Sequence, residues 1–384
     1  MIRSVQEINE KIRKGKAVVV SAAEFPSIAK KEGIREASRK IDVVTTGTFG
    51  PMCSSGVFLN FGQSKPKIRM QRVLINGVEA YTGLAAVDAY IGASQERNDD
   101  IRRGLSPSRL SYGGGHVIED LLKGERLTLE AFSSGTDCYP RKKWTKNFTL
   151  KELGDAIMVN PRNAYQNYNC AVNTSQKTIY TYMGMLKPDM GNINYCSAGE
   201  LSPLLNDPEY RAIGIGTRIF LGGGLGYVSF RGTQHSPKVK RNKFGTPVEP
   251  AGTLMVTGDL KGMSSKWIKG LNFTGYGVSL MVGIGIPIPI INEKVAAACA
   301  QGPEDITAPI VDYSKDYPEA TGKIISRASY ADLRSGSVKI EGKDIPTASL
   351  SSYFKALEIA EILKDKIDKK DLYLGEAQEL LSRS

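Results

Sequence analysis

The chain has 384 residues, of which 41% are hydrophobic and 24% are charged, as in a globular protein with a sizeable core. Its 51 Lys and Arg against 40 Asp and Glu give a formal net charge of +11, which can attract nucleic acid or anionic substrates. No run of about 18 apolar residues occurs, so we expect no membrane-spanning helix and no membrane partner. The charged N-terminal segment lacks an apolar signal core, which favours a cytoplasmic location.

The first part of the chain alternates helix and strand signals. Residues 4–14 form a predicted helix that begins with a capping box made by Ser4 and Glu7. A strand is expected over 16–21, a single helix over 28–39 and a buried β-branched strand over 43–46. Gly and Pro then predict a tight loop over 47–51, just before Cys53.

The next segments carry turn signals of different strength. Asn76-Gly77 lies between two apolar runs and is a strong signal for a β-hairpin. Residues 84–93 are small and apolar enough to predict a packed helix, and a further helix is expected over 117–122. The stretch 214–234 predicts strands around a triple-glycine turn, and it lacks the spacing of a dinucleotide or phosphate loop.

The last third is rich in strands and ends in a long helix. Short strands are expected over 307–313 and 337–340, and a helix over 349–369 whose apolar stripe includes Phe354. We find no repeat and no linker. The sequence therefore predicts one large α/β domain over residues 1–384, with mixed sheets, glycine-rich functional loops and a C-terminal helix.

Two of the five cysteines stand in similar surroundings. Cys53 follows a predicted strand and is succeeded by two serines and a glycine, and Cys138 follows a Ser- and Gly-rich run. A thiol among small residues and free backbone N–H groups can be reached and stabilised as a thiolate. We therefore expect the two loops to converge, although a small buried cysteine is the usual explanation for one such residue. The odd number of cysteines argues against a disulfide framework.

Other polar residues are candidates for binding and catalysis. A run of amides and phenols precedes Cys170 and suits a small polar ligand, with Asn163, Tyr165 and Asn167 as its binding candidates. His235, at a predicted strand end, is compatible with acid–base catalysis and equally with a structural role. Cys299 lies in an alanine-rich run and is expected to be structural.

The metal-binding signals are weak. Only two histidines exist and no CxxC pair occurs, which excludes a His-rich zinc site and a zinc ribbon. A 4Fe–4S iron–sulfur cluster held by widely spaced thiols, with one iron open for an exogenous sulfur, remains compatible with the sequence. Its candidate ligands are Cys53, Cys138, Cys170 and Cys196.

The residues alone leave several functions open. One is a cysteine-dependent or iron–sulfur-dependent transferase or lyase with another substrate. Another is a basic nucleic-acid-binding protein with structural cysteines. The basic segments 141–146 and 238–243 contain few aromatic side chains, so we expect no nucleic-acid partner.

Several longer motifs resemble a known family, the homocysteine-biosynthesis domain of anaerobes and methanogenic archaea. The resemblance spans about residues 4–370. It is carried by GTFGPMCSSGVFLNFG at 47–62, SGTDCYP at 134–140, NAYQNYN at 163–169, the long segment 201–235, and LSSYFKALEIAEILKD at 350–365. Many relatives continue into nucleotide-sensing modules (CBS domains), which we do not expect after the final helix of this chain.

The resemblance implies a sulfurtransferase that converts L-aspartate semialdehyde and a sulfide source into L-homocysteine, with a ferredoxin-type cluster protein as electron donor. It implies that Cys53 and Cys138 are the two characteristic cysteines, with Cys138 the main catalytic thiol. The substrate carboxylate requires a fixed cation, for which Arg162 and Arg218 are the candidates because guanidinium groups bind carboxylates in a bidentate manner. We further expect a homo-oligomer.

Overall fold

The structure is a computed structural model that describes residues 2–97, 111–163, 166–315 and 322–381. Its centre is a nine-stranded sheet in which every pairing is antiparallel. The strands are β3 (Thr48–Pro51), β4 (Gly56–Asn60), β7 (Asp88–Gly92), β10 (Ala156–Asn160), β16 (Arg218–Leu221), β17 (Gly224–Arg231), β18 (Leu254–Asp259), β19 (Ile268–Phe273) and β20 (Gly277–Gly285). Their order is β19-β20-β16-β17-β18-β10-β4-β7, with β3 also paired to β20.

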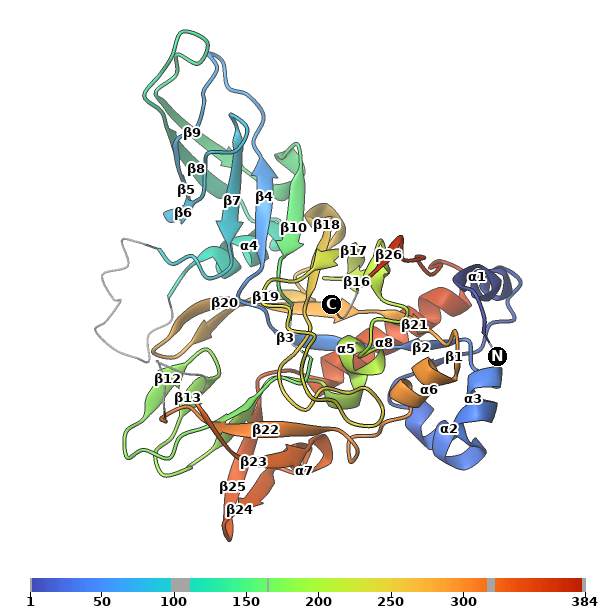
Figure 1. Ribbon diagram of the computed structural model, residues 1–384. Coiled ribbons are helices and arrows are strands. Elements are labelled where there is room, and N and C mark those ends of the chain that lie inside the picture. The colour runs from blue at the N-terminus through green and yellow to red at the C-terminus, as the bar shows by residue number, and fades with distance from the viewer. Residues whose placement is uncertain (1, 98–110, 164–165, 316–321, 382–384) are drawn as a thin grey trace.

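A four-stranded sheet projects from one end of the central sheet (Figure 1). It consists of β5 (Arg72–Ile75), β6 (Val78–Ala80), β8 (Leu127–Phe132) and β9 (Lys143–Phe148), in the order β6-β5-β8-β9. The predicted hairpin is confirmed, since Asn76 and Gly77 have φ values of 49° and 80° between β5 and β6. The connection between β8 and β9 lies at the far end of this projecting sheet (Figure 1).

A six-stranded mixed sheet lies on the opposite side of the central sheet (Figure 1). Its strands are β11 (Cys170–Val172), β14 (Ile193–Tyr195), β22 (Thr307–Asp312), β23 (Lys323–Ser329), β24 (Ser337–Ile340) and β25 (Lys343–Ser349), in the order β23-β22-β11-β14-β25-β24. Helix α7 (Tyr330–Arg334) and the hairpin of β12 (Ile179–Thr181) and β13 (Gly184–Leu186) belong to the same region. Parallel pairing of β11 with β22 and of β14 with β25 confirms the prediction of mixed sheets.

The remaining elements form the N-terminal part and cover the sheets. A small sheet has the order β1 (Val19–Ser21), β2 (Val43–Thr45) and β21 (Pro287–Pro289), and β15 (Gly214–Ile215) pairs with β26 (Glu379–Leu380). The α-helices are α1 (Val5–Arg13), α2 (Phe25–Glu32), α3 (Ile34–Lys40), α4 (Gly114–Lys123), α5 (Pro203–Asn206), α6 (Glu293–Cys299) and α8 (Tyr353–Asp368), and three short 3-10 helices cover Leu150–Glu152, Gly199–Leu201 and Leu260–Gly262. The Ser4–Glu7 capping box is present at α1.

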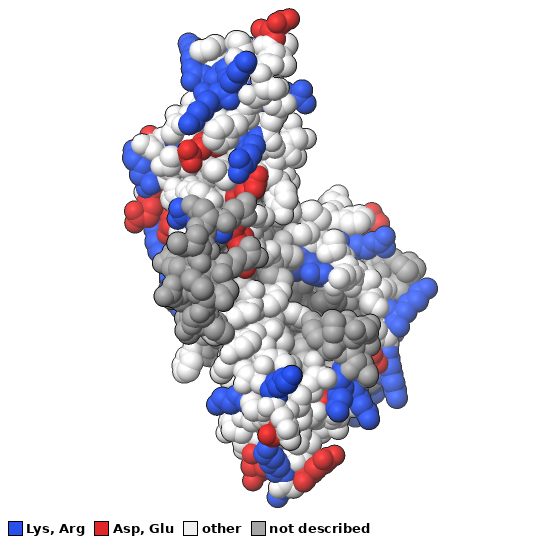
Figure 2. Space-filling view, turned by 90° about the vertical axis from the view of Figure 1, so that its left-hand side faces the viewer, with Lys and Arg blue, Asp and Glu red and all other residues white. Residues whose placement is uncertain are grey.

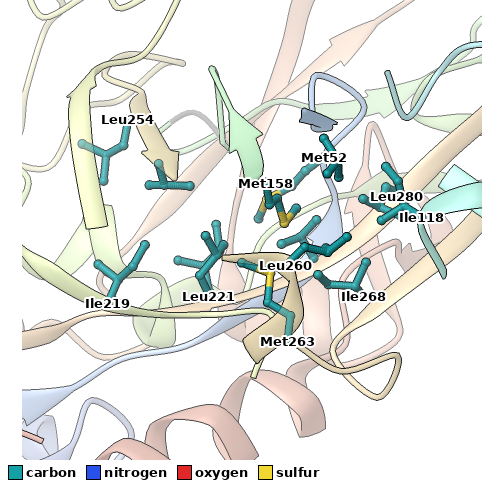
Figure 3. Close-up of a cluster of buried hydrophobic side chains, with 14 of the residues drawn as sticks. Met52, Ile118, Met158, Ile219, Leu221, Leu254, Leu260, Met263, Ile268 and Leu280 are labelled. Atoms are coloured by element: carbon teal, nitrogen blue, oxygen red, sulfur yellow. The ribbon is translucent and has the colours of Figure 1, made fainter. Parts of the chain in front are cut away.

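The central sheet contributes many side chains to the main hydrophobic core (Figure 3). Met52, at the end of β3, points into this core near Met158 from β10 (Figure 3) and is only 4% exposed. Helix α8, in the C-terminal part of the chain, packs on β3 and β20. The core therefore fixes the backbone on either side of Met52, the residue that precedes Cys53.

Three predicted elements were wrong. Residues 48–51 form strand β3 instead of a loop, because their backbone pairs with β20. The predicted helix over 84–93 contains β7, whose alternation of buried Ala89 and Ile91 with less buried neighbours has the period of a strand. The single helix over 28–39 is interrupted at Gly33, whose φ of 86° ends α2 and begins α3.

The C-terminal helix is confirmed, but Phe354 is not part of its buried stripe. Its side chain is 87% exposed, whereas Ile359 and Leu363 of the same helix are buried. Among the described residues, no helix combines the length and apolar character needed to cross a membrane. Lys and Arg side chains on the face seen in Figure 2 are interspersed with acidic ones and do not form one continuous basic tract.

Candidate active site

A cavity of about 340 Å³ opens between the central sheet and the six-stranded sheet. Its walls come from the turn after β3, the connections after β10, β14 and β17, the β12–β13 hairpin and the β19–β20 hairpin. The lining residues are Pro51, Met52, Cys53, Ser54, Arg162, Asn163, Tyr168, Tyr182, Met183, Cys196, Gln234, Phe273, Tyr276 and Ser279. The cavity is large enough for a small metabolite and contains two thiols.

Cys53 lies on a turn that is anchored on both sides. The backbone N–H of Met52 donates to the carbonyl of Leu280 on β20 at 2.8 Å, which holds the start of the turn on the central sheet. Ser54 Oγ donates to the carbonyl oxygen of Arg162 at 2.7 Å, which ties the turn to the connection after β10. Cys53 itself is exposed, so its thiol is accessible from the cavity and from solvent.

Cys196 forms part of the same cavity wall, directly after β14. Its Sγ lies 3.3 Å from Ser351 Oγ, at the start of the segment that leads into α8. A Cβ on Gly50 would be 3.5 Å from this sulfur and 2.5 Å from Ser351 Oγ, so β3 can pass here because Gly50 lacks a side chain. The pKa of the Cys196 thiol is raised to about 11, mainly by burial and to a smaller extent by the nearby Cys53, while the contact with Ser351 acts to lower it.

A second, smaller cavity of about 40 Å³ adjoins the first, and Cys196 lines both. The two cavities also share Pro51, Met52 and Asn163. Because the inner cavity has room for little more than a water molecule, the outer cavity is the one that can hold a substrate.

Arg162 is the one charged side chain among the described residues that line the outer cavity. No ion pair joins its guanidinium group to a carboxylate of the described residues. Asn163 and Gln234 add amide groups nearby, and Ser54 and Ser279 add hydroxyls. The cavity therefore combines a cation, hydrogen-bonding groups and a thiol, which suits a small carboxylate-bearing ligand.

Aromatic rings form another wall of the cavity. The Tyr182 ring lies 6.5 Å from that of Tyr168 and 6.2 Å from that of Tyr276, between ring centroids. The hydroxyls of Tyr182 and Tyr313 lie 3.3 Å apart, which fixes the β12–β13 hairpin against β22. These rings lower the polarity of the cavity around the two thiols.

The expected convergence of the Cys53 and Cys138 loops is not found within the chain. Cys138 lies in the β8–β9 connection at the far end of the projecting sheet and is exposed. Ser134 N–H donates to Gln71 Oε1 at 2.6 Å and Arg141 N–H donates to the carbonyl of Lys67 at 3.1 Å, which anchors this loop on its own sheet. Similar local composition correctly indicated two thiols in loops, but it carried no information on where the loops lie.

Two further candidates lie outside the cavity. Cys170 is fully buried in β11, and this burial raises the pKa of its thiol to about 12, as for a structural cysteine. Arg218 is on β16, where its nearest hydrogen-bond acceptor is the carbonyl of Tyr373 at 3.5 Å. It packs on the C-terminal segment beside Gly375 and does not reach the cavity wall.

The amide-rich segment divides between the cavity and the fold. Asn163 lines both cavities, as expected for a binding residue. The Asn167 side chain lines only the inner one, donates to the carbonyls of Pro247 and Thr307 at 2.8 and 2.7 Å, and accepts from Tyr330 at 3.0 Å. Asn167 therefore joins three parts of the chain and has a structural role. Tyr165 lies outside the described residues.

His235 follows a residue of the cavity wall but does not line the cavity. Its Nδ1 lies 3.0 Å from both the backbone nitrogen and the carbonyl oxygen of Thr253, and its Nε2 is buried without a partner among the described residues. Burial is the main cause that lowers the pKa of this imidazole, so the ring is neutral near pH 7. These contacts favour the structural role over acid–base catalysis.

The thiols do not fit a metal centre within one chain. Among the described residues, no group of three or more His, Cys, Asp or Glu side chains is arranged to hold a metal ion. The four candidate cysteines are divided between the outer cavity, the projecting sheet and the interior of β11. Of the four cysteines expected to bind an iron–sulfur cluster, only Cys53 and Cys196 lie in the same cavity.

Sequence reasoning missed part of the cavity wall. Ser351 and Tyr168 occur in motifs that carry the family resemblance, which was a usable signal for both. Tyr182, Phe273 and Tyr276 lie in hairpins with no distinctive pattern, and only the folded chain brings them to the cavity.

Comparisons with known proteins identify the family of the chain. Residues 17–374 match the model of a family described as homocysteine biosynthesis enzyme, sulfur-incorporation. The chain belongs to this family. Two proteins named L-aspartate semialdehyde sulfurtransferase are similar to it. The protein of Methanosarcina acetivorans is 50% identical over 99% of this chain and 72% of its own length, and that of Methanocaldococcus jannaschii is 50% identical over 100% and 74%.

The match over residues 17–374 confirms the family resemblance. None of the solved structures matches the chain.

Proposed function

We propose that this chain is an L-aspartate semialdehyde sulfurtransferase that forms L-homocysteine. The family match and the names of the two methanogen proteins support the reaction. The single structural observation that carries the proposal is the exposed Cys53 thiol in a cavity whose described lining contains one cation, Arg162. A sulfur-carrying thiol and a carboxylate-binding group are the two features that this substrate requires.

The chemistry sets what the site must do. Replacing the aldehyde oxygen by sulfur consumes one sulfide, releases one water and gives a thioaldehyde. Two electrons and two protons then convert the thioaldehyde into the thiol of homocysteine. The protein must therefore bind the amino acid, deliver sulfur to the aldehyde carbon and admit a reductant, and an exposed thiol at the cavity mouth is compatible with all three.

Each part of the cavity has a proposed task. Arg162 binds the substrate carboxylate, and Asn163 orients the substrate by hydrogen bonds. Cys53 carries the sulfur as a persulfide: its thiolate attacks the outer sulfur of a persulfide donor, the donor leaves as a thiolate, and the transferred sulfur then lies beside the aldehyde carbon. The tyrosine and phenylalanine rings limit access of water, which protects the thioaldehyde from hydrolysis.

Cys138 does not reach the cavity of its own chain, so any catalytic role of its thiol requires the cavity of another copy. The resemblance implies that this thiol is catalytic, and its loop lies at the end of the projecting sheet. We propose that the active form is a homo-oligomer in which the β8–β9 loop of a second copy brings Cys138 to the cavity mouth. An exposed thiol on a projecting sheet is suited to such an approach.

A ferredoxin-type cluster protein is the proposed electron donor, and the chain's own cluster stays a prediction. We derive no step through a cluster, because one chain brings at most two thiols together. Iron and acid-labile sulfide contents of anaerobically purified protein decide this point.

The experiment that tests the proposal is homocysteine formation under anaerobic conditions. The protein is incubated with L-aspartate semialdehyde, glutathione persulfide labelled with ³⁴S in its outer sulfur, and a low-potential reductant, and the product is identified by mass spectrometry. We expect ³⁴S-homocysteine that depends on protein, substrate and reductant. Absence of labelled homocysteine in the presence of correctly folded protein and a competent reductant would contradict the proposal.

A further inference from the structure

We infer that Cys196 is the second reacting thiol of the cavity: it attacks a sulfur-loaded Cys53, releases hydrosulfide and leaves a Cys53–Cys196 disulfide. The inference deepens the proposed function and rests on its assignment of Cys53 as the sulfur carrier. It concerns how the sulfur leaves the protein, a step for which the cavity needs a group besides Cys53.

The arrangement of the five cysteines singles out this pair. All five lie within the described residues, and only Cys53 and Cys196 line the outer cavity. The backbone of Gly50 is close to Cys196, because a Cβ added to Gly50 would lie 3.5 Å from Cys196 Sγ. Cys53 follows Gly50 by three residues, so at most about 10 Å of extended chain separates them. The contribution of Cys53 to the raised pKa of Cys196 reflects the same proximity.

The two thiols differ in a way that divides their tasks. Cys53 is exposed and accessible to a sulfur donor or a reductant. Cys196 is partly buried and is hydrogen-bonded to Ser351. At neutral pH the Cys196 thiol stays protonated, so it does not compete with Cys53 for the incoming sulfur. Confinement in one cavity offsets its low thiolate fraction, because an adjacent group reacts at a high effective concentration.

The step balances without any further reactant. A deprotonated persulfide, Cys53–S–S⁻, reacts with Cys196–SH: the bond between Cys53 Sγ and the terminal sulfur breaks, and a bond between the two Sγ atoms forms. The Cys196 proton goes to the leaving sulfur, which departs as HS⁻. The Cys196 sulfur is oxidised and the terminal sulfur is reduced by the same amount. The hydrosulfide is released beside the aldehyde carbon of the bound substrate.

The disulfide must then be reduced before the next cycle. Two electrons and two protons restore the dithiol, and the proposed ferredoxin-type electron donor supplies the electrons. Because Cys53 is exposed, the disulfide has one sulfur at the cavity mouth where such a donor can reach it. The inner sulfur leaves as the Cys196 thiol.

The test loads reduced protein with glutathione persulfide anaerobically, followed at once by desalting. Sulfide is then measured, and free thiols are alkylated before non-reducing peptide mass spectrometry. We expect wild-type protein to release close to one sulfide per loaded Cys53 and to yield a peptide pair linked through Cys53 and Cys196. Cys196→Ser, which keeps a hydrogen-bonding group for Ser351, should retain the persulfide and release at least tenfold less sulfide until dithiothreitol is added.

Cys299→Ser is the matched control, since Cys299 lies in α6, buried outside the cavity, and Ser can also donate to the carbonyl of Asn206. It should behave as wild type. Sulfide release from Cys196→Ser at the wild-type rate, or absence of the linked peptide from loaded wild-type protein, overturns the inference. The readouts need no aspartate semialdehyde, so they are independent of homocysteine formation. If the protein yields the linked peptide but forms no homocysteine, the proposed function is contradicted, whereas the reaction between Cys53 and Cys196 is supported.

Discussion

Ser351 Oγ lies 3.3 Å from Cys196 Sγ although the two residues are 155 positions apart in the chain. This contact joins the end of β14 to the segment that leads into α8, on the wall of a cavity whose mouth holds Cys53. The inner thiol is therefore positioned by the C-terminal part of the chain and the outer thiol by the central sheet. The relative placement of these two parts decides whether the site is complete.

Gly50 lies close to both Cys196 and Ser351, so we expect Gly50→Ala to disturb both parts. The added methyl group would lie 2.5 Å from Ser351 Oγ, which forces β3 or Ser351 to move. We expect a loss of about 1–3 kcal/mol in the free energy of unfolding, measured by denaturant titration, and reduced homocysteine formation. Gly262→Ala has open space around its Cβ and no positive φ, so it controls for the loss of a glycine without crowding the thiol. Unchanged stability in Gly50→Ala would contradict the packing described here.

The two candidate arginines make a matched pair. Arg162 lines the cavity and Arg218 does not, so Arg162→Lys should raise the KM for aspartate semialdehyde roughly tenfold by loss of bidentate binding. Arg218→Lys should leave the KM unchanged. Steady-state kinetics of the two variants, with melting temperatures as a check on folding, give the comparison. A raised KM in Arg218→Lys but not in Arg162→Lys would show that the substrate carboxylate does not bind to Arg162.

The thiols should differ in their response to pH. Because the pKa of Cys196 is raised to about 11, its reactive thiolate is scarce at neutral pH and increases about tenfold per unit of rising pH until pH 11. We therefore expect iodoacetamide to label Cys53 first near pH 7, and labelling of Cys196 to accelerate over the whole range from about pH 7 to pH 10. Peptide mass spectrometry after timed quenching measures both rates. If the labelling rate of Cys196 stops rising below about pH 9, the pKa of its thiol is not raised as described.

Cys138 provides a test of the oligomer. If a second copy supplies this thiol, Cys53→Ala and Cys138→Ala should each be inactive, and an equimolar mixture should regain activity after subunits exchange. For a symmetric dimer, random pairing gives half mixed dimers with one complete site each, so roughly a quarter of wild-type activity is expected. Failure of the mixture to recover, with exchange verified by mass spectrometry, would reject a shared site. Full activity of Cys138→Ala would remove this thiol from the reaction.

The sequence predicted features that depend on neighbouring residues and missed those that depend on distant ones. The capping box at Ser4 and the Asn76-Gly77 hairpin are local patterns, and both are found. The pattern at 47–51 was misjudged because Gly and Pro indicate a turn unless a partner strand, here β20, pairs with them. The amide-rich run before Cys170 supplied Asn163, and the need for a cation to bind the substrate carboxylate supplied Arg162. The same run also contributes to the fold through Asn167.

The pairing of the thiols was beyond local reasoning. Cys53 and Cys138 have similar Ser- and Gly-rich surroundings, yet one lies at the cavity and the other at the end of the projecting sheet. Cys196 is also followed by small residues, Ser197, Ala198 and Gly199, and it reaches the cavity because β14 ends beside Gly50. Such contacts follow from the order of strands in two sheets, which neither composition nor spacing encodes.

The most direct test of the central claim is homocysteine formation by Cys53→Ala. The side chain is exposed on a turn, so its truncation leaves no core cavity and the melting temperature should match that of wild type. With L-aspartate semialdehyde, glutathione persulfide and a low-potential reductant, we expect this variant to form no homocysteine above the protein-free rate. Homocysteine formation at the wild-type rate by folded Cys53→Ala would contradict the assignment of this cavity as the site of sulfur transfer.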